Sequence, residues 1–334
     1  MMKGTKHSTL IWVALGILLI GLAIVDVCCG AVWISPREII SSWGNQTTGS
    51  PIIDRIFFYL RLPKMLTAIL AGVALSVSGM MMQTLFRNPL AGPYILGVSS
   101  GACLGVAVVT MLQVAGGGLQ IASGSIAAAA IIGSIAVLMM MLPVARKVKD
   151  NVSLLIIGMM FGAVAGALVN VMQNISNPDS LKVFITWTLG SLSNVGWGEL
   201  AVMSAIIIIG MIIVITMMKP LNGLLLGETY AQGLGINVQR VRTWIVVATG
   251  LLAGAVTAFC GPIAFVGVAV PHIARGLMRT SNHRIIILAS ALIGANLLLA
   301  CDIICSLSTY PLPISTMSAL FGAPIIIGII LKNK

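Results

Sequence analysis

The segment from Arg61 to Ala102 joins an apolar run of membrane-spanning length to a loop rich in glycine and proline. A bilayer offers no hydrogen-bond partners, so backbone groups freed by a helix break must face protein or a water-filled cavity. Interrupted helices at membrane depth are typical of transporters, where they line a pathway. The residues we predict to form such breaks are Asn88, Pro89, Pro93 and Gly97 here, and Pro262, Pro271 and His272 in a later segment.

Composition places the whole chain in the membrane. It is 58% hydrophobic and 8% charged, with a mean hydropathy of +1.08, whereas soluble domains carry about 25% charged residues. A span needs about 20 apolar residues. We therefore predict an all-α integral membrane protein, one polytopic domain over residues 1–334, with about ten transmembrane helices. We place them near residues 9–34, 62–85, 94–114, 119–143, 152–173, 199–218, 241–260, 262–279, 285–305 and 314–331.

An internal repeat is suggested by two similar breaks. Gly92-Pro93 followed by Gly97-Val98 in one half resembles Gly261-Pro262 followed by Gly267-Val268 in the other. Paired breaks mark the repeats of many transporters. We therefore expect two pseudo-repeated halves, near residues 62–173 and 241–331, after a first helix near 9–34.

The charges indicate how the chain is oriented. With the amino terminus inside, five of the 19 Lys and Arg residues fall outside, which leaves 14 on cytoplasmic segments. This asymmetry obeys the positive-inside rule. We predict a multi-pass protein of the cell inner (plasma) membrane with both termini cytoplasmic, and the net charge of +11 requires no nucleic-acid partner. The five outer residues are Arg37, Arg55, Arg61, Lys64 and Lys182.

No metal site is predicted. All six cysteines fall within predicted spans, and none is spaced as a zinc ligand. His272 could bind metal or haem iron, but a lone imidazole is more often a hydrogen-bonding structural residue. Asp302 lies within a span and is a functional candidate because a buried charge is costly there.

The longest predicted cytoplasmic connection, residues 220–242, carries the clearest mechanistic pattern. Gly227 permits a turn, Glu228 suits the amino end of a short helix, and Gly235 ends that helix. The alternative is an amphipathic loop that only covers the underside of the bundle.

Three separated motifs resemble the FecCD/BtuC-type permease family of ABC importers, which take up iron-siderophores, haem or cobalamin. They are RLPK followed by NPLAGPYILGVSSGA, then LGETYAQGLG, and finally GPIAFVGVAVPHIAR with LPISTMSALFGAP. The resemblance covers about Arg55 to Leu331. Val268, Cys301, Ser306 and Ser315 depart from the family pattern.

The resemblance implies a type II ABC importer permease bundle and a set of partners. The chain has no G-x-x-x-x-G-K-[ST] phosphate loop. We therefore expect it to be no enzyme and to hold no cofactor, with ATP and Mg bound by a partner ATPase. We predict a homodimer, two ABC ATPase subunits and a periplasmic or lipid-anchored substrate-binding protein.

The resemblance also implies roles for particular residues. Contact with the ATPase is expected from Leu226, Gly227, Glu228, Ala231, Leu234 and Gly235. Docking of the binding protein falls to Arg61 and Lys64, with Arg55 the candidate to replace the arginine missing at Ser306. The cytoplasmic gate falls at Asn151, Val152 and Ser153, and an outer gate near residues 181–190.

Two alternatives remain. An ion-coupled secondary transporter would also show broken helices, but it should carry several intramembrane charges to bind the ion, and the carboxylates within the predicted spans are Asp26, Glu199 and Asp302. A non-transporting membrane anchor would have no need of paired breaks. The ligand itself is not encoded in any residue set, and we favour an iron chelate because such importers are abundant in the family.

Overall fold

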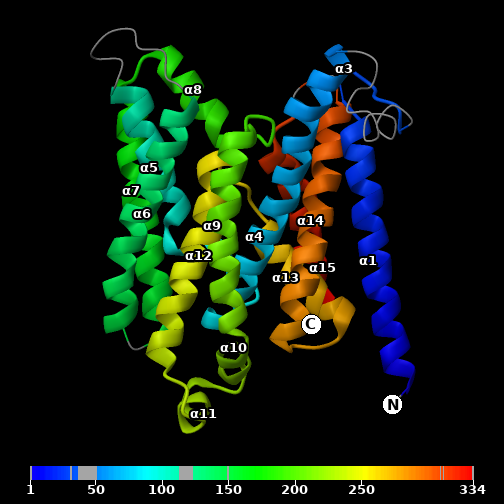
Figure 1. The fold of residues 1–334 in the computed structure, drawn as a ribbon. Helices are drawn as coiled ribbons and strands as arrows, with labels where there is room; N and C mark the ends of the chain where they lie inside the picture. Colours follow the sequence, from blue (N-terminus) through cyan, green and yellow to red (C-terminus); the bar gives the residue numbers. More distant parts are fainter. Residues whose placement is uncertain are drawn as a thin grey trace.

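The fold is a helical bundle, seen in a computed structural model that describes residues 2–30, 32–36, 51–112, 123–148, 150–308, 310 and 312–332. In these residues all regular structure is helical. Seven helices are long and apolar enough to cross a membrane, and three shorter apolar helices accompany them. The prediction of about ten transmembrane helices is confirmed (Figure 1).

The long helices run roughly side by side (Figure 1). The long helices are α1 (Met2–Cys28), α4 (Leu62–Phe86), α6 (Ser123–Lys147), α7 (Asn151–Ile175), α9 (Trp197–Thr216), α12 (Val238–Cys260) and α14 (His283–Leu307), and the shorter apolar helix α15 (Ile314–Lys332) follows them. The short helices are α3 (Pro51–Ile56), α5 (Val98–Ala107), α8 (Pro178–Thr188), α10 (Met218–Leu225), α11 (Glu228–Gly233) and α13 (Val266–Met278).

The two ends of the bundle differ in what they carry. Helices α10 and α11 lie at one end, which we call the α11 end, and α3 and α8 lie at the other, the α8 end (Figure 1). Helix α1 begins on the side of the α11 end, and α15 ends toward that same side (Figure 1).

Several predicted boundaries are wrong. The first helix ends at Cys28 rather than Ile34, because the chain leaves the helix at Gly30, whose φ is +155°. The second helix begins earlier than predicted, since α3 continues through a π-helix at Phe57–Arg61 into α4. The span near 262–279 begins only at Val266, after Phe265 with φ +65°.

The predicted span near 94–114 is divided into three pieces. A 3₁₀ turn at Pro93–Leu96 precedes α5, and a π-helix at Val108–Leu112 follows it. Gly97 separates the first two pieces with φ +77°, a conformation that glycine adopts at little cost. The break expected from the proline and glycine pattern therefore lies beside Pro93, as predicted.

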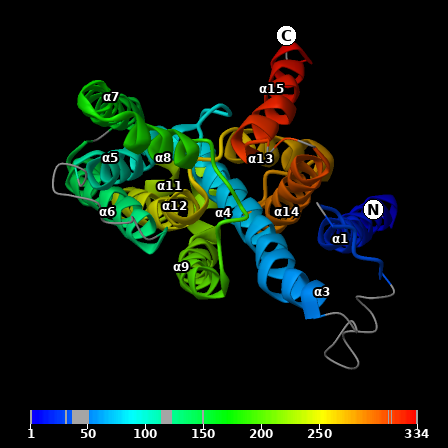
Figure 2. The same cartoon turned by 90° about the horizontal axis from the view of Figure 1, so that it is seen from above.

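Helix α4 lies near the middle of the bundle and packs on α12, α13 and α14 (Figure 2). Its backbone approaches two neighbours closely at glycines. A Cβ on Gly79 would lie 1.7 Å from the carbonyl oxygen of Gly267, and one on Gly72 would lie 2.3 Å from that of Gly294. Small residues allow such approach where lipid removes the hydrophobic driving force.

The glycine series in α5 serves packing in the same way. A Cβ on Gly101 would meet the carbonyl oxygen of Gly133 at 2.5 Å, and one on Gly105 would meet that of Ala129 at 2.2 Å. Each predicted half contains a long helix, a Gly-Pro break and a short apolar helix. The repeat relation between the halves stays a prediction.

Candidate functional site

The α10–α11 hairpin has the form that its sequence predicts. Helix α10 ends at Leu225, and Gly227 then turns the chain with φ +115°. Helix α11 opens with Glu228 in its first turn, where a carboxylate faces the positive end of the helix dipole. After α11, Gly235 adopts φ +79°, so a residue with a Cβ would be strained at both turns.

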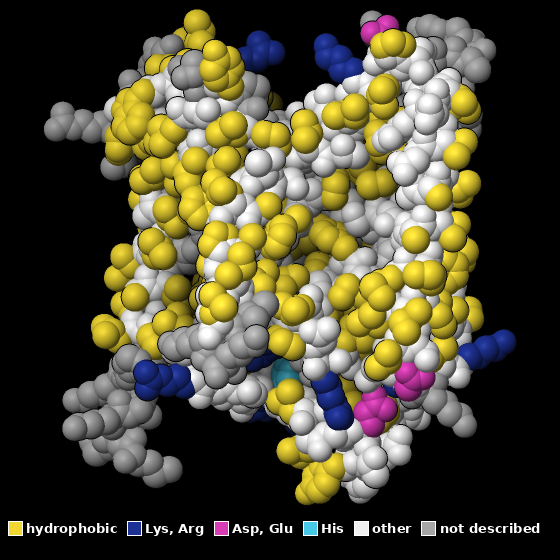
Figure 3. Space-filling view, turned by 180° about the vertical axis from the view of Figure 1, so that it is seen from behind, with side chains coloured by type: hydrophobic (Ala, Val, Ile, Leu, Met, Phe, Trp, Pro, Cys, Tyr) yellow, Lys and Arg dark blue, Asp and Glu magenta, His cyan; other side chains and the backbone are white. Residues whose placement is uncertain are grey.

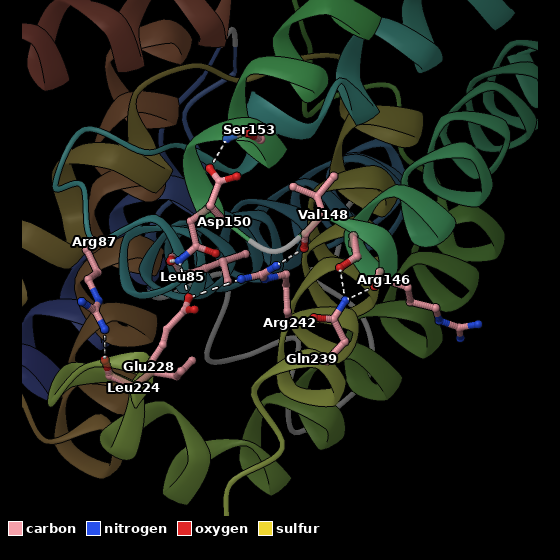
Figure 4. A network of polar contacts seen from close by, with 12 residues as sticks. Leu85, Arg87, Arg146, Val148, Asp150, Ser153, Leu224, Glu228, Gln239 and Arg242 are labelled. Atoms are coloured by element: carbon pink, nitrogen blue, oxygen red, sulfur yellow. Dashed lines mark hydrogen bonds and ion pairs between the residues drawn. The ribbon is translucent and has the colours of Figure 1, made fainter. Parts of the chain in front are cut away.

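Glu228 joins the hairpin to two other helices. Its Oε1 accepts a hydrogen bond from Asn151 Nδ2 at 2.7 Å and lies 3.3 Å from Arg242 Nη2, with which it forms an ion pair. Asn151 is the first residue of α7 and belongs to the predicted gate. The Glu228 carboxylate, in the segment 220–242 that is predicted to contact the ATPase, therefore contacts the predicted gate directly (Figure 4).

Asn151 and Arg242 extend this network to two helix ends. Asn151 Nδ2 also donates to the carbonyl oxygen of Leu85 near the end of α4, at 2.8 Å. Arg242 Nη1 donates to Val148 O at 2.5 Å, just after α6. The last carbonyls of a helix lack partners within it, so these side chains tie α4 and α6 to the hairpin.

Gln239 and Arg87 add contacts on either side. Gln239 Nε2 donates to Ala145 O at 2.8 Å and also to Arg146 O, both in the last turn of α6. Arg87 follows α4 in a left-handed conformation, and its Nη2 lies 3.4 Å from Leu224 O in α10. Four helices, α4, α6, α7 and α12, thus meet the α10–α11 hairpin at this end (Figure 4).

A buried histidine fixes α10 to the bundle. His283 Nε2 lies 2.9 Å from Thr84 Oγ1 in α4, and its Nδ1 lies 2.8 Å from Asn222 Oδ1 in α10. The backbone N–H of His283 also donates to Asn222 Oδ1, at 2.9 Å. The base of the hairpin is therefore held in place while α11 projects from it.

An open groove of about 1010 Å³, which we call the α11 groove, lies between the hairpin and the start of α7. Apolar and aromatic side chains stand exposed along it, including Leu226 at 62% and Tyr230 at 59%. Ala231, by contrast, is fully buried and anchors α11. The groove is lined by Phe86, Arg87, Asp150, Asn151, Val152, Leu226, Gly227, Glu228, Thr229, Tyr230, Gly233 and Leu234.

Asp150 caps the helix that carries the predicted gate. Its Oδ1 accepts a hydrogen bond from the backbone N–H of Ser153 at 2.7 Å, the usual geometry of an N-cap. This bond lowers the pKa of Asp150 below its ordinary value of 3.8. Ser153 therefore supports the start of α7 through its backbone, whereas Val152 is exposed beside the groove.

The predicted breaks lie together beside α4. A Cβ on Gly267 would meet Pro93 Cδ at 2.6 Å, and the N–H of Ile263 donates to Tyr94 Oη at 3.4 Å. Gln83 of α4 binds the second break twice, since its Nε2 donates to Val268 O at 3.0 Å and its Oε1 accepts from Arg275 Nη1 at 2.7 Å.

The remaining break residues lie at the end of α4 and just before or within α13. Asn88 and Pro89 follow α4 directly, with Asn88 Oδ1 accepting from the N–H of Leu90 at 2.9 Å. Pro262 precedes α13, while Pro271 and His272 lie inside it. His272 is half-buried. Among the described residues, no three His, Cys, Asp or Glu side chains are placed to hold a metal ion.

At the α8 end, the cations predicted for docking lie in different surroundings. Lys64 Nζ forms an ion pair with Asp302 Oδ1 at 2.9 Å and donates to Ser306 Oγ at 2.6 Å. Asp302, a functional candidate because of its place within a span, is therefore paired with Lys64 near the end of its helix. Arg61 Nη1 donates to Cys29 O after α1. Arg55 is exposed on α3, beside Trp197 of α9.

Sequence reasoning missed three residues of the network: Arg87, Gln239 and Arg242. For Arg242 a signal was present. Val238, Val241 and Ile245 are buried on one side of α12, and a residue four after Val238 shares that side. An arginine on an apolar helix face near its amino end indicates a buried partner, here Glu228.

The fold and site define a class: a polytopic helical membrane protein with broken central helices and a hairpin projecting from one end. The chain belongs to the FecCD transport family, whose model matches residues 17–332. It is an ABC importer permease of that type.

Individual relatives agree with this assignment. Vitamin B12 import system permease proteins BtuC from Salmonella paratyphi A and Salmonella arizonae are each 34% identical over 322 residues. These matches cover 96% of this chain and 94% and 93% of the two relatives. A solved inward-facing metal-chelate type ABC transporter has a TM-score of 0.85 and 28% identity, covering 97% of this chain and 99% of that one.

A more distant structure shares the fold alone. PsaBC from Streptococcus pneumoniae in complex with Fab is 16% identical, with a TM-score of 0.57, and the match covers 86% of this chain and 94% of that one.

Proposed function

We propose that this permease forms the translocation pathway for a chelated-metal compound of the cobalamin, haem or iron-siderophore class, driven by ATP hydrolysis in a separate subunit. The observation that carries the proposal is the Glu228 carboxylate, which bonds Asn151 of α7 and Arg242 of α12 at once. A push on α11 would therefore reach the start of a membrane-spanning helix through one side chain.

The α11 groove is the proposed ATPase contact. A hairpin that projects beyond the bundle, with exposed Leu226, Tyr230 and Leu234, offers apolar anchors of the kind that enter pockets in partners. Its base is fixed by His283 and Asn222, so force applied at the tip would move α7 and α12 rather than bend the hairpin alone. The excess of predicted cytoplasmic cations at this end favours a cytoplasmic position for it.

Helix α7 is the proposed pathway helix because its two exposed sides differ. One side carries large aliphatic residues suited to lipid, namely Met160, Val164, Leu168, Val171 and Ile175. The adjoining side carries small and polar residues, namely Ala163, Gly166, Ala167, Asn170 and Asn174. Amide side chains facing lipid would be costly, so this side would face water or a second protomer.

The arrangement of the bundle supports a symmetric pair. Helices α7 and α15 lie on the same side of the molecule (Figure 2), and that face is largely hydrophobic and hollowed between two lobes (Figure 3). We propose a homodimer that closes this hollow around the pathway, since closed two-fold pairs are the commonest assemblies. Two ATPases would bind below, and a substrate-binding protein would dock at the α8 end.

The substrate is proposed from the relatives. Two of them are described as vitamin B12 import permeases, and the solved neighbour as a metal-chelate type transporter. Cobalamin is therefore the first ligand to test, ahead of the iron chelate that family abundance alone favours.

Reconstitution in proteoliposomes with the ATPase and binding protein tests this function. We expect ATP-dependent uptake that a protonophore leaves intact, and stimulation of ATP hydrolysis by one of cobalamin, haem or an iron-siderophore. Uptake that survives ATP depletion and collapses with the protonophore would instead show an ion-coupled transporter. The Lys64–Asp302 ion pair argues against that alternative, because it occupies a carboxylate that an ion would need.

A further inference from the structure

A second groove, distinct from the α11 groove, lies at the seam of α6 and α12. It has a volume of about 440 Å³ and is lined by Leu142, Arg146, Asn237, Gln239, Arg240, Thr243, Trp244 and Val247. Two arginines contribute positive charge, and no acidic residue lines it. Within the described part of the chain, neither guanidinium has an ion-pair partner.

The groove combines a cationic mouth with an apolar wall. Arg146 lies in the last turn of α6, and Arg240 lies in the first turn of α12, so both charges stand at the membrane boundary. Leu142 lies about one turn from Arg146, and Val247 lies about two turns from Arg240, both deeper into the membrane. Trp244 stands 41% exposed between the two zones, and tryptophan favours the headgroup level of a bilayer.

The surrounding contacts hold the groove open. The Gln239 amide donates to the carbonyl oxygens of Ala145 and Arg146 and so joins α12 to α6. The side chains of Arg146 and Arg240 take no part in these two hydrogen bonds. Figure 4 shows the guanidinium of Arg146 pointing away from the Glu228 network. Asn237 Oδ1 accepts from the N–H of Arg240 at 2.9 Å and so fixes the start of α12.

The position of the seam indicates that lipid reaches it. Helices α6 and α12 lie side by side, away from the face that carries α7 and α15 (Figure 2). Basic grooves between membrane helices bind the headgroups of anionic lipids. We propose that this groove binds an anionic phospholipid, with its phosphate between Arg146 and Arg240 and an acyl chain along Leu142 and Val247.

The bound lipid would bridge α6 and α12 next to the Arg242–Glu228 ion pair. Arg242 lies two residues after Arg240 and contacts the end of α6 through Val148 O. The lipid would thus stabilise the same helix junction that the ion pair holds. It is a ligand of the permease itself, independent of the transported substrate.

Native mass spectrometry of the purified permease with phosphatidylglycerol or phosphatidylcholine tests the site. We expect preferential binding of phosphatidylglycerol and about a twenty-five-fold higher Kd in the double variant Arg146→Gln/Arg240→Gln, because each cation near an anionic headgroup contributes roughly fivefold. The matched control is Lys219→Gln/Arg284→Gln, which removes two exposed cations from the same end and should bind as the wild type does. Equal losses in both double variants, or none in either, would overturn the proposal.

Fluorescence gives an independent readout that does not rely on the arginine variants. Brominated phosphatidylglycerol should quench the permease more than brominated phosphatidylcholine does, and Trp244→Phe should abolish that difference. Trp33→Phe, at the other end of the bundle, should preserve it. An unchanged difference in Trp244→Phe contradicts the site. Normal lipid binding with weakened ATPase binding in Arg146→Gln/Arg240→Gln would show that the groove is a protein contact instead.

Discussion

Arg242 has 1% of its side chain exposed and lies 3.3 Å from Glu228, which keeps contact with solvent. A buried guanidinium needs both a counter-charge and hydrogen-bond acceptors. Glu228 provides the charge, and Val148 O accepts a hydrogen bond. At the scale of residues, the packing of the α11 end thus depends on the buried Arg242 guanidinium, which few other side chains could replace.

At the α8 end, substitution of Lys64 tests whether this cation stabilises the fold or binds a partner protein. Lys64→Met would leave Asp302 buried without its counter-ion, and we expect a loss of about 3 kcal/mol in the free energy of unfolding. Lys64→Met/Asp302→Leu should regain most of it, and Lys182→Met, an exposed lysine at the same end, should change little. Unchanged thermal unfolding of Lys64→Met, with weaker binding-protein affinity, would show that Lys64 acts chiefly in docking.

Asp150 predicts a pH dependence at the start of α7. Its pKa is lowered in the folded protein by the hydrogen bond from Ser153 N–H. The contribution of the Asp150 charge to the free energy of unfolding is therefore fully present above the unfolded pKa, near 4. It is lost as the pH falls through the folded pKa. Thermal unfolding of wild type and Asp150→Asn should differ at pH 7 and converge below pH 4. A difference that is constant with pH would contradict this role.

At the scale of elements, the close contact of α4 with α13 fixes the two breaks. Gly79 and Gly267 bring these backbones together, and Pro93 packs against the same glycine. The positions of the helices that carry the breaks therefore depend on glycines, because the lack of a side chain lets the two backbones approach.

Substitution at Gly79 tests this packing. Gly79→Ala would place a Cβ 1.7 Å from the carbonyl oxygen of Gly267, and we expect a loss of about 1–3 kcal/mol as the helices separate. Gly276→Ala in α13 is the control, because a Cβ there meets nothing within 4 Å. Thermal unfolding in detergent measures both. Equal stability of the two variants would mean that α4 and α13 need no such contact.

For the whole molecule, the sequence predicts the class, the number of helices and the short helix after Gly227, because hydropathy and glycine positions are local signals. It does not predict that Glu228 contacts Asn151, since that pairing depends on how α7 and α11 pack. From the sequence we assigned Lys64 to docking of the substrate-binding protein. The sequence did not reveal the ion pair of Lys64 with Asp302. Contacts across 77 and 242 positions, as for Asn151 with Glu228 and Lys64 with Ser306, require the fold.

We propose above all that the Glu228–Asn151 contact carries ATPase motion to α7. A double-mutant cycle tests it: the ratio of substrate transported to ATP hydrolysed, in proteoliposomes, for Glu228→Ala, Asn151→Ala and the double variant. Because Glu228 also pairs with Arg242, we predict that Asn151→Ala lowers the ratio about tenfold, that Glu228→Ala lowers it at least as much, and that the double variant is no worse than Glu228→Ala. The proposal would be contradicted if the losses of the two single variants multiplied in the double variant. A ratio equal to that of the wild type in either single variant would contradict it as well.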